Sequence, residues 1–336
     1  MAAVGGTVLT LLDAVKRRDP TGRIMPIVEL LEQKNTIMED IPWVEGNLTT
    51  GHRCAMRTGL PTVAWRLLNQ GVTPSKSTTA HVDEQAGMME GWSEVDRDLA
   101  ELGGNVGEFR YSEALAFVEA MRQEFASTLF YGNAGLNPEE FTGLSVRYSD
   151  IGAGAPENAQ NIIDGGGTGS DNSSIWLIVW GQNSVFGFYP KGTMAGLQHE
   201  DKGMVTLQGA TGIGTSRLDV YQEKWQWKCG LAVKDWRYAV RLCNIDISNL
   251  VAKSSATDIT EKMQKAIHRV PNLMAGRAGI YCNRTVFQEW CIQRRDDVGT
   301  GGGFTFENVD GVIKYSYMGI PVRICDALVE TEARVV

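Results

Sequence analysis

The sequence lacks the cysteine and histidine spacings that hold metal ions. Its six cysteines form no Cys-x-x-Cys pair, and its four histidines show neither a His-x-x-x-His nor a His-Glu-x-x-His spacing. Most of the cysteines lie beside apolar residues, which is typical of small buried side chains in a reducing compartment. We therefore predict no metal site. His199 is followed by Glu200 and Asp201, and we interpret this segment as a solvated turn. The alternative is a turn that binds a cation.

The sequence also lacks a complete nucleotide-binding or nucleophile motif. The segment GATGIGTS (209–216) resembles a phosphate-binding loop, but Thr215 stands where that motif requires lysine. The GGGTG run (165–169) lacks the glycine register of a dinucleotide site, and no Gly-x-Ser-x-Gly motif is present. We therefore predict no cofactor and no catalytic residue. An α+β enzyme whose site assembles only in space remains the alternative of a different class.

Positive charge is scarce, and long apolar runs are absent. The chain carries a net charge of −8, and its one basic cluster is the run KRRDP at 16–20. This composition disfavours a protein that grips a phosphate backbone. The longest apolar run, IWLIVW at 175–180, falls far short of the roughly 20 residues that span a bilayer. The N-terminal region is apolar first and basic afterwards, the reverse of a secretory signal, so we expect no membrane partner and no export.

What the chain does contain is typical of a packed α+β protein. Hydrophobic residues make up 43% of it, enough for a sizeable core. Helical spacing predicts a long helix over Tyr111–Tyr131 capped by Ser112, a second over Thr257–Arg269, and a third after an Asn283 cap. Strand-like runs lie between these helices. We therefore predict an α+β class with interleaved segments.

The segment from residue 47 to 84 reads as a long hairpin with little to bury. Val63, Trp65 and Leu67 alternate with polar or small residues, NQGVTP (69–74) is turn material, and the return arm is polar. An isolated two-stranded ribbon is marginal in water. We therefore expect the ribbon to lie on another subunit.

A second extended stretch, Trp225–Ile247, is rich in aromatic and basic residues. We expect Trp236 and Tyr238 to face the core, and Arg237 and Arg241 to point toward a partner or an acidic helix. The alternative is an aromatic row that serves only to pack a core helix. Neither interpretation requires catalysis.

Several strings, in their order, resemble the major capsid proteins of tailed bacteriophages, most of all the podovirus-type head proteins related to phage epsilon-fifteen. They run from residue 43 to residue 328 and include WVEGN, RTGLPTVAWR, GVTPSKSTTA, FASTLFYGN, FTGL, GSDNSSIWLIVWG, YPKG, GLAVKDWRYAVRLCNID, YCNRTV and MGIPVRICDAL. Because many separated strings agree in order, the resemblance is specific and nearly end to end.

The resemblance implies the Hong Kong 97-like capsid fold. The expected segments are an N-terminal arm (1–46), an extended E-loop (47–84), a P-domain with the spine helix (85–134), a first A-domain part (135–224), a long P-domain strand (225–250), a second A-domain part (251–305) and C-terminal P-domain strands (306–336). Some relatives carry a scaffolding segment before the arm. The arm lies close to residue 1 here, so we expect a separate scaffold protein.

The implied function is a major capsid protein that self-assembles as hexamers and pentamers into an icosahedral virion head around double-stranded DNA. Implied partners are other copies of the chain, a scaffold, a possible cement protein and a portal, with assembly in the host bacterial cytoplasm. The expected inter-subunit contacts are Val63, Trp65, Leu67, Arg66, Lys76, Arg237 and Arg241. We expect non-covalent contacts rather than a cross-link through Lys76. The alternative within the same fold is an encapsulin-type nanocompartment shell.

Overall fold

The computed structural model describes residues 13, 32–102, 104–152, 154–208, 217–254, 256–296, 304–309 and 312–336. The chain forms two compact units. The first comprises Met1–Gln33, Met88–Phe125 and Gly196–Lys228, and the second comprises Lys34–Gly87, Ala126–Ala195 and Cys229–Val336. Helices and strands are interleaved along the chain, which confirms the α+β class. The basic run 16–20 and the segment 209–216, which resembles a phosphate-binding loop, lie outside the described residues.

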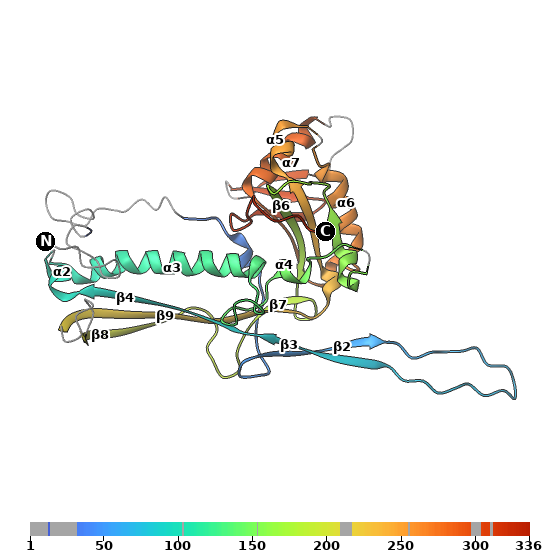
Figure 1. Ribbon diagram of the computed structural model, residues 1–336, viewed down its shortest axis with the longest axis horizontal. Coiled ribbons are helices and arrows are strands. Elements are labelled where there is room, and N and C mark those ends of the chain that lie inside the picture. Colours follow the sequence, from blue (N-terminus) through green and yellow to red (C-terminus); the bar gives the residue numbers. More distant parts are fainter. Residues whose placement is uncertain are drawn as a thin grey trace. The chain divides into compact units, whose positions relative to one another are not determined.

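The first unit consists of a long helix on an antiparallel sheet (Figure 1). Its strands are β4 (Gly87–Asp96), β8 (Gln198–Gln208) and β9 (Arg217–Val233), and its helices are α2 (Arg97–Glu101) and α3 (Val106–Tyr131). β8 pairs with β9 from Gln198↔Gln226 to Gln208↔Arg217, and β9 neighbours β4. Both β9 and α3 continue into the second unit.

Aromatic stacking fixes α3 to this sheet. The ring of Phe117 stacks on Trp225 at a centroid distance of 5.3 Å, and Phe125 stacks on Trp227 at 4.5 Å. Gly91 in β4 leaves room for the helix, because a Cβ there would lie 3.2 Å from the Phe117 ring. The aromatic residues Trp225 and Trp227 of β9 therefore pack the helix against the sheet.

The helix begins five residues before the predicted position. Asn105 caps it, since its Oδ1 accepts a hydrogen bond from the Glu108 backbone N–H at 3.2 Å. The predicted cap, Ser112, lies within the helix instead, where its hydroxyl donates to the Phe109 carbonyl at 2.8 Å. The prediction of Ser112 as a cap is therefore wrong.

The second unit is built around a mixed sheet. Its strands run in the order β12 (Phe304–Val309), β13 (Val312–Tyr317), β14 (Ile320–Ile324), β11 (Arg277–Cys282), β6 (Asn172–Trp180), β7 (Val185–Tyr189) and the end of β9. Further strands pair at its sides: β10 (Ala239–Asp246) with β6, β5 (Ile162–Asp164) with β10, and β1 (Trp43–Glu45) with β7. β6 is buried along its whole length, because both of its faces are covered.

Three helices pack on this sheet: α5 (Ile247–Ala252), α6 (Ile259–Arg269) and α7 (Arg284–Asp296) (Figure 1). Shorter pieces are η1 (Thr36–Glu39), α4 (Leu144–Arg147), η2 (Glu157–Asn161), η3 (Trp236–Tyr238) and η4 (Leu273–Ala275). The Asp258 carboxylate caps α6 by accepting from the Glu261 N–H at 3.0 Å. The predicted Asn283 cap of α7 is confirmed by its 2.9 Å bond from the Thr285 N–H.

The single long strand predicted for residues 225–250 is wrong. β9 ends at Val233, and the side chain of Asp235 then accepts a hydrogen bond from the Arg237 N–H at 3.0 Å. This contact turns Trp236–Tyr238 into the 3-10 helix η3 before β10 begins. Trp236 and Tyr238 are therefore half-buried rather than inside the core. All eight residues of β10 are buried, so buried and exposed residues do not alternate along this strand as predicted.

The two units also divide the chain differently from the predicted capsid segments. Residues 196–228 group with the long helix and β4, apart from the rest of the segment 135–224. The hairpin prediction for 47–84 agrees with β2 (Gly51–Gly59) and β3 (Thr78–Gln85). The names of the capsid domains remain predictions from the resemblance.

Replacing Phe125 by alanine should lower the free energy of unfolding by about 3–5 kcal/mol, because the ring is buried and its loss leaves a cavity against Trp227. Tyr111→Ala, on an exposed position of the same helix, should change it by less than about 0.5 kcal/mol. Chemical denaturation of the unassembled subunit measures both. Equal losses would contradict the packing described for α3.

Candidate assembly surface

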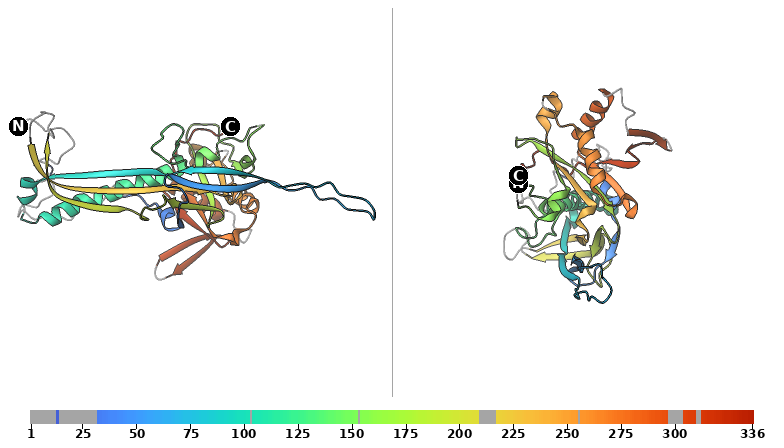
Figure 2. Two further views of the ribbon diagram at one scale, coloured as in Figure 1. Left: turned by 90° about the horizontal axis from the view of Figure 1, so that it is seen from below. Right: turned by 90° about the vertical axis from the view of Figure 1, so that its right-hand side faces the viewer.

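The hairpin β2–β3 carries a long loop, residues 60–77. The two strands pair antiparallel from Gly51↔Gln85 to Gly59↔Thr78. Beyond this pairing the chain continues as an extended excursion without strand pairing (Figure 2). The paired arms are therefore shorter than the sequence predicts, and Val63, Trp65 and Leu67 lie in the loop rather than in a strand.

The base of the hairpin is fixed to the second unit. Cys54 is buried with Phe186 and Phe188. The carboxylate of Glu84, itself buried, accepts two hydrogen bonds from the Arg147 guanidinium at 2.7 and 2.6 Å. A bidentate pair of this kind specifies geometry as well as charge, so the hairpin leaves the unit in a defined direction.

The loop itself exposes its apolar side chains to water. Residues 60–79 are all exposed, and the large apolar members are Leu60, Val63, Trp65, Leu67, Leu68 and Val72. A turn at Leu67–Gln70, with Asn69 at φ 64°, and a 2.8 Å bond from the Ser75 hydroxyl to the Thr62 carbonyl shape the loop. Contiguous exposed apolar residues of this kind mark interaction sites in soluble proteins.

Five of the seven predicted contact residues lie together on this loop. Arg66 and Lys76 are exposed there with Val63, Trp65 and Leu67. Arg237 is also exposed and pairs with Asp235 of its own chain at 2.7 Å. The contact of these six residues with a neighbouring subunit remains a prediction.

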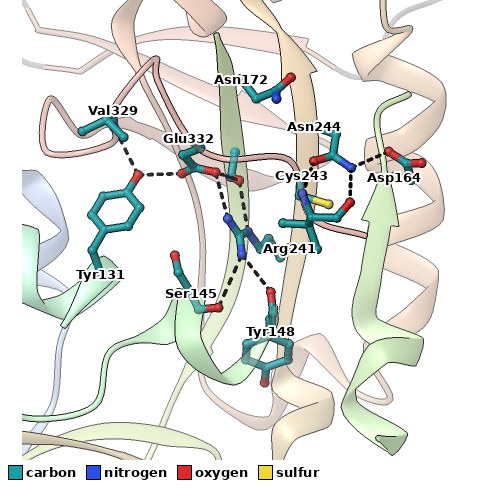
Figure 3. Close-up of polar contacts among 12 residues, drawn as sticks. Tyr131, Ser145, Tyr148, Asp164, Asn172, Arg241, Cys243, Asn244, Val329 and Glu332 are labelled. Carbon is teal, nitrogen blue, oxygen red and sulfur yellow. Dashed lines mark hydrogen bonds and ion pairs between the residues drawn. The ribbon is translucent and has the colours of Figure 1, made fainter. Parts of the chain in front are cut away.

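Arg241 is the exception, because the structure buries it. Its Nη2 lies 2.8 Å from the Glu332 Oε2, its Nε donates to the Ser174 hydroxyl at 3.1 Å, and its Nη1 donates to the Tyr148 carbonyl at 2.8 Å (Figure 3). The guanidinium also lies over the Trp176 ring, 5.3 Å from its centroid. The expectation that Arg241 faces a neighbour is therefore wrong: both faces of β10 are covered by its own chain.

This buried network fastens the C-terminal segment to the sheet. Glu332 also accepts a hydrogen bond from the Tyr131 hydroxyl at 2.6 Å, and the Asn244 side chain bonds both backbone groups of Val335 (Figure 3). Burial, with the adjacent Glu332 carboxylate, raises the pKa of Tyr131 above its ordinary value. The phenol therefore stays protonated and keeps donating to Glu332 at neutral pH.

The roles of two carboxylates in this region were not predicted from the sequence. Glu332 lies in a short polar stretch, and Glu84 lies among the polar residues of a strand end. Their partners, Arg241 and Arg147, are 91 and 63 residues away along the chain. No local spacing connects such pairs, so no sequence signal could have found them.

The described residues also include several cysteines, whose surroundings can be compared with those of metal ligands. No group of three or more His, Cys, Asp or Glu residues among them could hold a metal ion. Burial raises the pKa of the thiols of Cys229, Cys243 and Cys325 to about 12, so they are neutral near pH 7. No helix in the described part of the chain is long and apolar enough to cross a membrane.

A packed α+β body that presents a long apolar loop to water has the architecture of a subunit that assembles with other chains. The family model "Major capsid protein GP7" matches residues 19–336, and the chain belongs to this family. The resemblance found in the sequence is confirmed. The chain is thus a subunit of an icosahedral capsid shell, a component of the virion, with the Hong Kong 97-like fold.

A solved structure at 30% identity agrees with this assignment. The chain is similar to one from bacteriophage Epsilon15, with 30% identity, a TM-score of 0.79, and coverage of 100% of this chain and 99% of that one. It also matches the capsid of bacteriophage JBD30 (9% identity, TM-score 0.47, 90% and 95% covered) and the SrpI encapsulin of Synechococcus elongatus (11%, 0.44, 70% and 95%). No curated protein matches.

Arg241→Met should lower the free energy of unfolding by about 3–5 kcal/mol, because it leaves the Glu332 carboxylate buried without its partner. The double variant Arg241→Met, Glu332→Met should recover part of this loss, since it removes both charges. Thermal and chemical unfolding of the three proteins measure the difference. A single variant as stable as the parent would show that the pair is not held in the folded subunit.

Proposed function

We propose that the chain forms the hexamers and pentamers of a virion head that encloses double-stranded DNA. The observation that supports this most is the loop 60–77, whose apolar side chains are exposed while its base is fixed. A second copy of the chain is the surface that the loop is built to meet. The shell then consists of subunits held together by loops that each reach a neighbour.

The energetics of the loop support many weak contacts rather than one strong one. Fully burying an aliphatic or aromatic side chain stabilises by about 1.5–3 kcal/mol. Ordering the loop costs about 1–2 kcal/mol per fixed backbone residue. The surplus per loop is therefore small, but a closed shell repeats it at every subunit.

The further partners in this proposal are a separate scaffold protein, a portal at one vertex and a cement protein, with assembly in the host cytoplasm. The net charge of −8 supports an inner wall that does not clamp DNA through rows of basic residues. We also propose that the chain is not an enzyme. Turnover that a single pocket substitution abolishes would contradict this. Ordered phosphates held along rows of basic residues would instead contradict the proposal about the inner wall.

The rival shell, an encapsulin-type compartment, would enclose protein cargo instead. Double-stranded DNA inside purified particles separates the two. The family membership favours the virion head, while the encapsulin likeness carries no argument at its TM-score of 0.44.

Deleting the loop tip, Leu68–Ser77, should leave a folded subunit that cannot build stable shells. The deleted residues are all exposed, so the core keeps its contacts, while the neighbour loses a part of the loop. Expression with the scaffold partner, followed by thermal melting and sedimentation, measures both effects.

A matched control keeps the loop length. Val63→Ser, Trp65→Ser and Leu67→Ser together should weaken assembly as the deletion does, whereas Thr62→Ala and Thr73→Ala, in the same loop, should not. Shells of unchanged salt and heat resistance from the deletion variant would refute the proposal. A deletion variant that no longer folds would do so too, because the loop would then belong to the subunit's own core.

A further inference from the structure

The loop differs in charge from the chain that carries it. Residues 54–82 contain Arg57, Arg66 and Lys76 and no aspartate or glutamate, although the whole chain carries −8. Arg66 lies directly between the exposed residues Trp65 and Leu67. A surface that receives this loop must therefore offer apolar area beside negative charge, because unlike charges favour the encounter and like charges oppose it.

The most exposed apolar side chains of the described chain offer the apolar part of such a surface. Outside the loop, the large apolar side chains that are more than 70% exposed are Leu136 (78%), Met194 (74%) and Met274 (92%). Along the chain, no aspartate or glutamate occurs from residue 172 to residue 199 around Met194, or from residue 262 to residue 288 around Met274. Neither segment therefore offers negative charge of its own to the loop.

The residues around Leu136 in the sequence carry negative charge, opposite to that of the loop. Glu139 and Glu140 follow it, and no lysine or arginine occurs from residue 123 to residue 146. Glu139 is exposed beside Leu136, so the two side chains offer a carboxylate and an apolar group within one short turn. Charge therefore selects this turn, residues 133–140, among the three apolar sites that are more than 70% exposed.

The turn is also held rigidly by its own hydrogen bonds. The Asn133 carbonyl accepts from the N–H groups of Leu136 and Asn137 at 3.0 and 2.8 Å, and the Asn133 side chain accepts from the Gly135 N–H at 3.0 Å. The Asn137 side chain donates to Glu140 at 3.1 Å. A preformed turn loses little conformational freedom when it binds, which favours a role as a contact surface.

We propose that the loop 60–77 of one copy docks on the turn 133–140 of a second copy, with Trp65 against Leu136 and Arg66 against Glu139. This inference rests on the proposed function, since it names the surface that the loop meets. The rest of the loop's apolar residues extend the same contact.

The apolar half of the contact is tested by Leu136→Asp, with Leu136→Met as the matched control. Both variants should melt like the parent, because the side chain is exposed. Leu136→Asp should raise the subunit concentration needed for shell assembly by about tenfold or more, as expected for loss of a central contact, and Leu136→Met should leave it unchanged. Sedimentation against concentration gives the value. Unchanged assembly of Leu136→Asp would overturn the proposal.

The charged half is tested by exchanging the signs. Glu139→Lys and Arg66→Glu should each weaken assembly, and the two together should restore it toward the parent. A double variant that assembles no better than either single one overturns the pairing. If the loop deletion abolishes shells while the Leu136 and Glu139 variants assemble normally, this inference fails and the proposed function stands. If the deletion variant also assembles normally, both fail.

Discussion

The apolar side chains of the loop 60–77 lie in water in the single chain, and the rest of the account depends on this fact. Trp65 and its apolar neighbours contribute hydrophobic stabilisation only after they leave water. In the proposed shell, a second chain is the surface that covers them. This constraint gives a physical reason for a loop whose apolar side chains find no partner within the described part of its own chain. It also agrees with membership of a capsid protein family.

A loop of this kind can act only if its base does not move. Glu84 and Arg147 fix the hairpin base, and Arg241 and Glu332 fasten the C-terminal segment within the same unit. Buried ion pairs contribute little net stability compared with apolar packing, but they permit few alternative arrangements. The second unit thus has an interior held in one arrangement by buried ion pairs, and a loop whose apolar side chains are exposed in the single chain.

Features set by local sequence could be predicted, and features set by distant segments could not. Helical spacing over Tyr111–Tyr131 indicated the long helix, and Asn283 was predicted as the cap of α7, because helix formation depends on near neighbours. The polar return arm likewise indicated the exposed hairpin. The burial of both faces of β10 could not be predicted, since Glu332, which pairs with Arg241, is 91 residues away along the chain. The side chain of Asp235, which ends the long strand, reads in sequence as an ordinary solvated residue.

A reconstruction of the assembled particle would show directly where Trp65 lies. We expect the indole ring to be buried against a neighbouring copy of the chain in every symmetry-independent subunit where the loop is ordered. A particle in which the indole ring stays exposed to solvent, or packs on its own chain, would contradict it.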